Sequence, residues 1–286
     1  METGNFKGFE IRVQDPGIAI FEFNTPERLN GLNQEIKRDL VESMVQAQMD
    51  DGIRVLVFTG QGRAFCAGDD ISGRTAQFNE TTPLVPEIPH GHNHAIGTYN
   101  GLRWLSQTVN TTIRGLDKLS IAAVNGVAVQ TGLSLALACD FRVASESARL
   151  MSGTLRFGLL PDEGGQYLLT QHMGVAKAMD FMMLNRMVGA EEALALGLVH
   201  EVVPAESLMD RSLELATELA NGPQVAMRFL KRSIYNAHEM TWEQSLDEIA
   251  SKTAITDHLP DAREGGTSFR EKRRPQFNQD APARSE

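Results

Sequence analysis

Two glycine-containing turns in the first half of the chain constrain its fold more than any other feature. The first, at 65–71, reads Phe-Cys-Ala-Gly-Asp-Asp-Ile and follows the β-branched run 55–58. The second, within 123–132, follows the apolar run 121–124 and opens an apolar helical stretch. Two turns that leave strands can each point a backbone N–H group at one shared oxygen atom. Such a pair stabilises negative charge that develops on a carbonyl oxygen, so the pattern favours an enzyme that binds a thioester.

Strands and helices alternate through the first two thirds of the chain. A break at Asp15-Pro16-Gly17 predicts a β-hairpin over residues 8–25, and a helix follows from Asn33 with apolar side chains on one face. The order strand, helix, strand then recurs at 121–144. This alternation predicts an α/β fold with its site in the loops that leave the strands.

The chain becomes mostly helical from residue 164 onward. Because the last predicted strand lies at 199–203, we place the boundary after it and predict two parts. A β/α core at 1–204 carries the site, and a helical C-terminal region covers 205–286. The polar segment 73–100 has no clear periodicity and is predicted to be a loop. The predicted helices cover 167–171, 176–184, 190–195, 207–220, 225–237, 243–255 and 261–272, with a short strand at 199–203.

Composition narrows the range of partners. The formal net charge of −10 argues against nucleic acid, and no apolar run is long enough to cross a membrane. The N-terminus lacks the features of a secretory signal, and the two cysteines, Cys66 and Cys139, lie in hydrophobic settings typical of free thiols. A cytoplasmic protein is therefore expected.

The alternating His90, His92 and His94 are interpreted as surface residues, and no metal site is predicted.

Several ordered motifs together make the chain resemble the crotonase, or enoyl-CoA hydratase/isomerase, superfamily. The resemblance runs from about residue 9 to residue 277, nearly the whole chain. Its motifs lie at 24–30, 65–71, 123–142, 158–165, 193–199 and 263–273.

The resemblance implies a crotonase-like spiral of ββα units followed by a helical trimerisation region. It implies an acyl-CoA substrate, with coenzyme A present only as part of the thioester and no permanently bound cofactor. The thioester carbonyl would lie between the backbone amides of Asp69 and Thr131. The chain would assemble as a homotrimer or a dimer of trimers. Residues that match the coenzyme A site are Arg28, Ala67, Asp69, Asp70 and Ile71, with Phe269 and Lys272 completing the site of a neighbouring subunit.

The chain departs from the family at the two catalytic glutamates of the hydratases. Their positions hold Ser134 and Thr154, and neither hydroxyl can act as a base near neutral pH without a partner. Carboxylates occur instead at Asp162 and Glu163, in a Pro-Asp-x-Gly-Gly motif that resembles the ring-epoxide (1,2-epoxyphenylacetyl-CoA) isomerases of this superfamily. We predict Asp162 as the catalytic base, with Glu163 the weaker candidate.

Other interpretations of these residues stay open. Asp162 and Glu163 precede a helix, where acidic side chains also cap free N–H groups. A nucleophilic Ser134 is disfavoured because its segment is predicted to be a buried helix. The leading prediction is an enoyl-CoA or ring-epoxide acyl-CoA isomerase that uses one carboxylate. The alternatives are an atypical hydratase, a β-dicarbonyl acyl-CoA hydrolase, and a non-catalytic acyl-CoA-binding protein.

Overall fold

The computed structural model describes residues 1–70 and 94–279. Its N-terminal strands follow from the alternation of apolar and polar residues in β2 (Phe9–Gln14), while β3 (Ile18–Phe23) is buried almost throughout. The two strands pair antiparallel, which confirms the predicted hairpin, and β1 (Gly4–Phe6) extends it. On its other edge β3 pairs in parallel with the fully buried β4 (Val55–Gly60).

Within the described residues the strands form two sheets. The larger has seven strands in the order β1-β2-β3-β4-β6-β8-β11, and the smaller has four in the order β10-β9-β7-β5. Three successive strand pairs, β4/β5, β6/β7 and β8/β9, each give their first strand to the large sheet and their second to the small one. This repeat is the spiral expected from the resemblance. The remaining strands are β5 (Ala64–Cys66), β6 (Leu119–Val124), β7 (Val127–Val129), β8 (Phe141–Ser145), β9 (Arg149–Met151), β10 (Val188–Gly189) and β11 (Glu201–Val203).

The small sheet refines one prediction. The apolar runs at 55–58 and 121–124 lie in β4 and β6, and Asn125-Gly126 follows β6 directly, as predicted. The short strands β5 and β7 were not predicted, and they separate these runs from Asp69 and Thr131. Each of these strands has three residues, too few to show a period of two in the sequence. Because β5 and β7 pair in parallel, their carboxyl ends meet at the same edge of the sheet.

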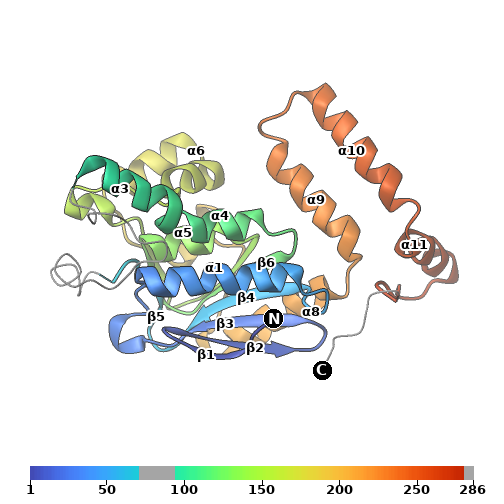
Figure 1. Ribbon diagram of the computed structural model, residues 1–286, viewed down its shortest axis with the longest axis horizontal. Helices are drawn as coiled ribbons and strands as arrows, with labels where there is room; N and C mark the ends of the chain where they lie inside the picture. Colours follow the sequence, from blue (N-terminus) through green and yellow to red (C-terminus); the bar gives the residue numbers. More distant parts are fainter. Residues whose placement is uncertain (71–93, 280–286) are drawn as a thin grey trace.

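Helices cover the sheets and bury one main apolar core between the layers (Figure 1). Among them, α1 (Gln34–Met49) begins at Asn33, whose side chain accepts the N–H of Ile36, and α4 packs against both α1 and α5. The segment predicted as a loop at 73–100 contains a helix, α3, at its end; residues 73–93 lie outside the described residues. The other helices of this part are α3 (Ala95–Gly101), a π-helix η2 (Leu102–Ser106), α4 (Thr108–Gly115), α5 (Thr131–Ala138), α6 (Gly165–Met183) and α7 (Ala190–Ala195), with 3₁₀-helices η1 (Pro26–Arg28) and η3 (Thr154–Phe157).

The C-terminal helices lie in two different settings. Helix α8 (Leu208–Ala220), which follows η4 (Ala205–Ser207), packs on the large sheet and buries a second apolar cluster there. Helices α9 (Gln224–Asn236), α10 (Trp242–Thr256) and α11 (Pro260–Glu271) extend to one side of the molecule (Figure 1). These bounds confirm the predicted helices within about two residues at each end. The division into two parts at residue 204 remains a prediction.

Candidate active site

The two glycine turns are in direct contact, and glycine is required at the points where they meet. A Cβ atom on Gly132 would lie 1.9 Å from the carbonyl oxygen of Cys66, and one on Gly68 would lie 2.8 Å from Cβ of Gln130. No side chain fits at Gly132 without moving the backbone of the other turn. The start of α5 is therefore pressed against the loop that follows β5.

The backbone amides predicted to form the oxyanion hole take no part in the hydrogen bonds between the described residues. The N–H of Leu32 donates to Gly68 O at 2.9 Å, and the N–H of Asp70 donates to Leu32 O at 3.0 Å. The amide of Asp69 lies between these two bonds and therefore faces away from Leu32. Thr131 is the first residue of α5, where N–H groups lack an intrahelical acceptor. Across residues 1–70 and 94–279, neither amide donates a hydrogen bond to another protein group.

A buried network of charged and polar side chains lies at the same place. The ammonium of Lys37 lies 2.7 Å from Asp69 Oδ1 and 3.4 Å from Glu163 Oε1. The hydroxyl of Thr131 lies 2.8 Å from Asp69 Oδ1 and 2.6 Å from Glu163 Oε1. Four separate segments of the chain thus meet in one cluster, and two of its members carry the candidate oxyanion amides.

Burial and neighbouring charges shift the pKa values of Glu163 and Lys37. Burial and, to a smaller extent, the neighbouring charge of Asp69 raise the pKa of Glu163, and against the opposing effects of Lys37 and Thr131 the result is a pKa of about 7. Burial would lower the pKa of Lys37, but the two carboxyl groups outweigh it and the pKa is raised. Lys37 therefore stays charged near neutral pH, while Glu163 can exchange a proton there.

The turn that carries Asp162 and Glu163 is fixed by polar side chains from the neighbouring helices. The amide of Gln107 donates to the carbonyl of Asp162 at 2.8 Å, and that of Asn110 donates to the carbonyl of Glu163 at 2.9 Å. The N-cap position of α6 belongs to Gly164, and no side chain forms a cap hydrogen bond there. The carboxyl of Glu163 is turned into the network instead, and Asp162 is half-buried.

The two positions of the hydratase glutamates are buried and hold hydroxyls. Ser134 lies on α5 and faces the start of α6, since a Cβ on Gly165 would come within 2.9 Å of its Oγ. Thr154 lies in η3, and its Oγ1 has no hydrogen-bond partner among the described residues. The buried helix predicted around Ser134 is confirmed.

The predicted coenzyme A residues divide into two groups. Arg28 lies beside the first turn, with Nη1 2.8 Å from Asp70 Oδ2 and a side chain that is 60% exposed. Ala67 is held to the same segment, its N–H donating to Leu29 O at 3.0 Å. Ile71 lies outside the described residues.

The second group does not join the site within one chain. Phe269 lies on α11 and is 85% exposed, and Lys272 follows that helix directly. In Figure 1, α11 lies at the opposite end of the molecule from β5 and α3. A contribution of these two residues to the site requires a second copy of the chain.

Sequence reasoning missed Lys37, which it placed only inside a predicted helix. The available signal was its spacing: Lys37, Leu40 and Met44 fall on one face of α1, and all three are buried. A lysine on a buried helix face needs a partner of opposite charge, so the position could have been singled out.

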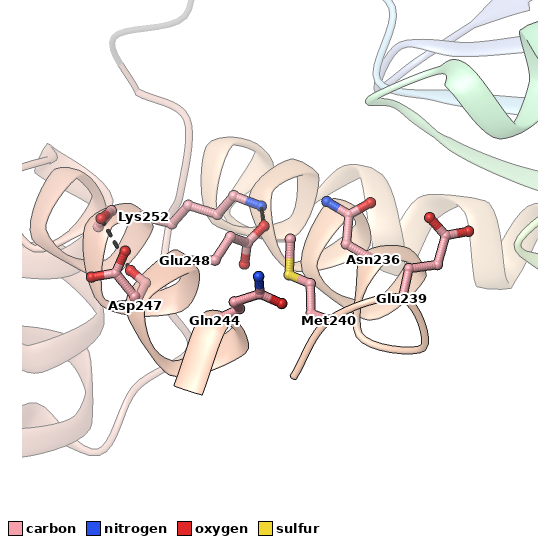
Figure 2. A pocket seen from close by; sticks show the side chains of 8 residues that line it. Asn236, Glu239, Met240, Gln244, Asp247, Glu248 and Lys252 are labelled. Carbon is pink, nitrogen blue, oxygen red and sulfur yellow. Dashed lines mark hydrogen bonds and ion pairs between the residues drawn. The ribbon is translucent and has the colours of Figure 1, made fainter. Parts of the chain in front are cut away.

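Other features of the molecule lie apart from this cluster. A pocket between the end of α9 and α10 is lined mainly by polar side chains, with Lys252 turned toward Glu248 (Figure 2). In the part of the chain that the structure describes, no group of histidine, cysteine and acidic side chains is arranged to hold a metal ion. His94 caps α3, accepting the N–H of Gly97 at its Nδ1, whereas His90 and His92 lie outside the described residues. None of the described helices has the length and apolar character needed to span a membrane.

Comparison with known proteins places these motifs in a family. Residues 14–280 match the model of the enoyl-CoA hydratase/isomerase family. The chain is 35% identical to a 1,2-epoxyphenylacetyl-CoA isomerase of Escherichia coli over 272 residues, covering 94% of this chain and 98% of the relative. It is 32% identical to a probable enoyl-CoA hydratase of Rhodobacter capsulatus, covering 91% and 94%.

A comparison of structures agrees with the sequence matches. The crystal structure of an enoyl-CoA hydratase from Bacillus anthracis superposes with a TM-score of 0.83 at 28% identity, covering 94% of this chain and 98% of that one. The spiral of paired strands and the glycine turns at 65–71 and 123–132 lie within the matched residues. The chain belongs to the enoyl-CoA hydratase/isomerase family.

Proposed function

We propose that this protein is an acyl-CoA isomerase that stabilises a thioester enolate and moves one proton with one carboxylate. The observation that carries the proposal is the contact between the two glycine turns, which brings together two amides with no acceptor among the described residues. Such donors lower the energy of negative charge on a carbonyl oxygen as it develops.

Asp162 is proposed as the base. Its carboxylate takes a proton from the α- or γ-carbon. The electron pair of that C–H bond forms a carbon–carbon double bond, which displaces the π electrons of the thioester C=O onto its oxygen, where the amides of Asp69 and Thr131 hold the enolate or dienolate. The protonated Asp162 then returns the proton to another carbon, so substrate and product have equal mass. Only one carboxylate is needed for this exchange, which suits a chain with hydroxyls at 134 and 154.

The substrate class is an enoyl-CoA or a ring-epoxide acyl-CoA. The name of the Escherichia coli relative, 1,2-epoxyphenylacetyl-CoA isomerase, supports the second. Coenzyme A enters as part of the substrate, held by Arg28, Ala67, Asp69, Asp70 and Ile71. Phe269 and Lys272 of a neighbouring copy complete the site in a homotrimer or a dimer of trimers. The guanidinium of Arg28 is 60% exposed, which supports a contact with a phosphate group.

A hydratase or hydrolase is the second candidate. The hydratase is supported by relatives named as probable enoyl-CoA hydratases, such as that of Rhodobacter capsulatus. Mass spectrometry separates the two, because isomerisation conserves mass whereas hydration and hydrolysis add water. A protein that binds acyl-CoA tightly but promotes no exchange of α- or γ-hydrogens for deuterium would instead be a binding protein.

The test of the proposed base is Asp162→Asn. We expect kcat to fall by at least about a hundredfold, since general acid–base groups contribute roughly 10²–10⁴. Asp180→Asn, which neutralises an exposed carboxylate on α6, is the control and should leave kcat unchanged. Full activity of Asp162→Asn on every accepted thioester would exclude Asp162 as the base.

A further inference from the structure

The hydrogen bonds of Thr131 require an additional proton in the buried network. Its hydroxyl lies within hydrogen-bond distance of two carboxyl oxygens, Asp69 Oδ1 at 2.8 Å and Glu163 Oε1 at 2.6 Å. A hydroxyl has one proton and can donate to only one of them. Two oxygens at 2.6 to 2.8 Å with no hydrogen between them would repel, so one of the two carboxyl groups must itself be the donor.

The distances to Lys37 indicate which carboxyl carries this proton. The ammonium lies 2.7 Å from Asp69 but 3.4 Å from Glu163, so Asp69 is the group whose negative charge is neutralised. The side chain of Asp69 is also 30% exposed, against 4% for Glu163, and burial favours the uncharged form of an acid. Glu163 is therefore the protonated member of the pair.

We propose that Glu163 is a protonated positioning residue, donating to Thr131, which donates to Asp69, while Lys37 neutralises Asp69. This inference rests on the proposed function, because Asp69 and Thr131 carry the proposed oxyanion amides. With Glu163 protonated, the charges of Lys37 and Asp69 cancel and the network is neutral beside the developing enolate. Loss of the proton leaves one uncompensated negative charge there and breaks one of the two Thr131 hydrogen bonds.

The surroundings of Glu163 set the direction of the pH effect. Helix α1 contributes Lys37, β5 contributes the Cys66 thiol, the following loop contributes Asp69, and Asp162 is adjacent in the chain. Helices α4 and α5 contribute the uncharged Asn110 and Thr131. Burial raises the pKa of the Cys66 thiol to about 12, so this thiol stays protonated while Glu163 titrates. Raising the pH through the pKa of Glu163, about 7, should therefore lower activity.

The decisive variant is Glu163→Gln, which keeps a donor for Thr131 and cannot ionise. Activity is measured as kcat/KM across pH for an accepted acyl-CoA. We expect the original enzyme to lose about tenfold per pH unit above the pKa, and Glu163→Gln to stay within roughly threefold between pH 6 and 9. Asp140→Asn, which changes a mostly buried carboxyl that pairs with Lys231 and not with Lys37, is the control and should keep the original decline. The same decline in Glu163→Gln, or its inactivity at every pH as a folded protein, would overturn the proposal.

A second readout does not depend on turnover. Infrared difference spectra should contain the C=O band of a protonated carboxyl at pH 6, lose it at pH 9, and lack it in Glu163→Gln. Absence of the band at pH 6 overturns the proposal. If the band is present while no acyl-CoA is turned over or exchanged, the proton assignment holds and the proposed function fails.

The role of Lys37 is tested against a matched buried lysine. Lys231 is buried and lies 2.8 Å from Asp140, far from the two turns in the sequence, so Lys231→Met also removes a paired buried ammonium. We expect Lys37→Met to lower kcat/KM by at least about tenfold beyond any effect of Lys231→Met. Equal losses in the two variants would show a structural role only and contradict the proposal.

Discussion

At the scale of single residues, Gln130 has a backbone conformation that favours glycine. Its φ of 52° and ψ of −122° match the first central position of a type II′ turn, where glycine is usual. A non-glycine residue in such a region costs about 1–3 kcal/mol. The turn that places the amide of Thr131 is therefore formed against a local backbone preference, and its contacts with the first turn must compensate.

This backbone cost predicts that Gln130→Gly stabilises the protein. Glycine removes the strain of the positive φ, which costs about 1–3 kcal/mol. It adds an entropic cost of about 0.5–1 kcal/mol, because glycine has more freedom in the unfolded chain. We therefore expect the free energy of unfolding to increase by about 1 kcal/mol. Urea denaturation measures it. Gln130→Ala is the control: it also shortens the side chain but keeps the Cβ, and should give no gain. Equal gains from both variants would assign the effect to the side chain.

The residue scale also shows where prediction from sequence failed. Asp69, Thr131 and Glu163 were predicted as site residues because they lie in or beside the glycine-containing motifs that resemble the family. Lys37 was missed because its role depends on partners distant in sequence, Asp69 and Glu163, which only the folded chain brings within reach. Helical periodicity shows which face is buried but not what lies opposite it.

At the scale of elements, α6 was predicted well for a physical reason. Two helices, 167–171 and 176–184, were expected on either side of Gly174, and the structure has one helical span, Gly165–Met183, in which Gly174 departs from helical geometry (φ 75°, ψ 164°). The helices were predictable because apolar residues recur at helical spacing. The strands β5 and β7 were not, because their three residues each are defined by pairing with one another.

Gly174 gives a prediction that separates the effect of backbone conformation on stability from the effect of side-chain packing. A Cβ there would meet no atom within 4 Å, and the same is true of Gly266 in the regular helix α11. We expect Gly174→Ala to cost about 1–3 kcal/mol because of its positive φ, and Gly266→Ala to stabilise by about 0.5–1 kcal/mol. Thermal unfolding of both variants measures this difference. If both substitutions changed the stability in the same direction, backbone conformation would not be what determines the effect of alanine at these two positions.

At the scale of the whole molecule, the C-terminal helices present apolar surface that one chain does not cover. Leu230 and Ile234 on α9, Trp242 and Ile255 on α10, and Phe269 on α11 are each more than half exposed. Exposed apolar groups gathered on neighbouring elements are typical of interaction surfaces. This setting is consistent with the proposed homotrimer, in which α11 of one copy would reach the site of the next.

A complementation experiment tests that arrangement. Lys272→Glu should raise KM for the acyl-CoA by about tenfold, because it reverses a charge expected to face a phosphate, whereas Asp162→Asn removes the proposed base. If one chain supplies Asp162 and its neighbour supplies Lys272, oligomers that contain both variants regain intact sites. Random assembly at equal amounts would make roughly a quarter of the sites intact. Co-expression with two affinity tags isolates these oligomers, and saturation kinetics should then include a component with the original KM.

If Lys272 instead acted within its own chain, every site would carry one of the two changes. The mixed oligomers would then be no more active than the separate variants, and the shared site would be excluded.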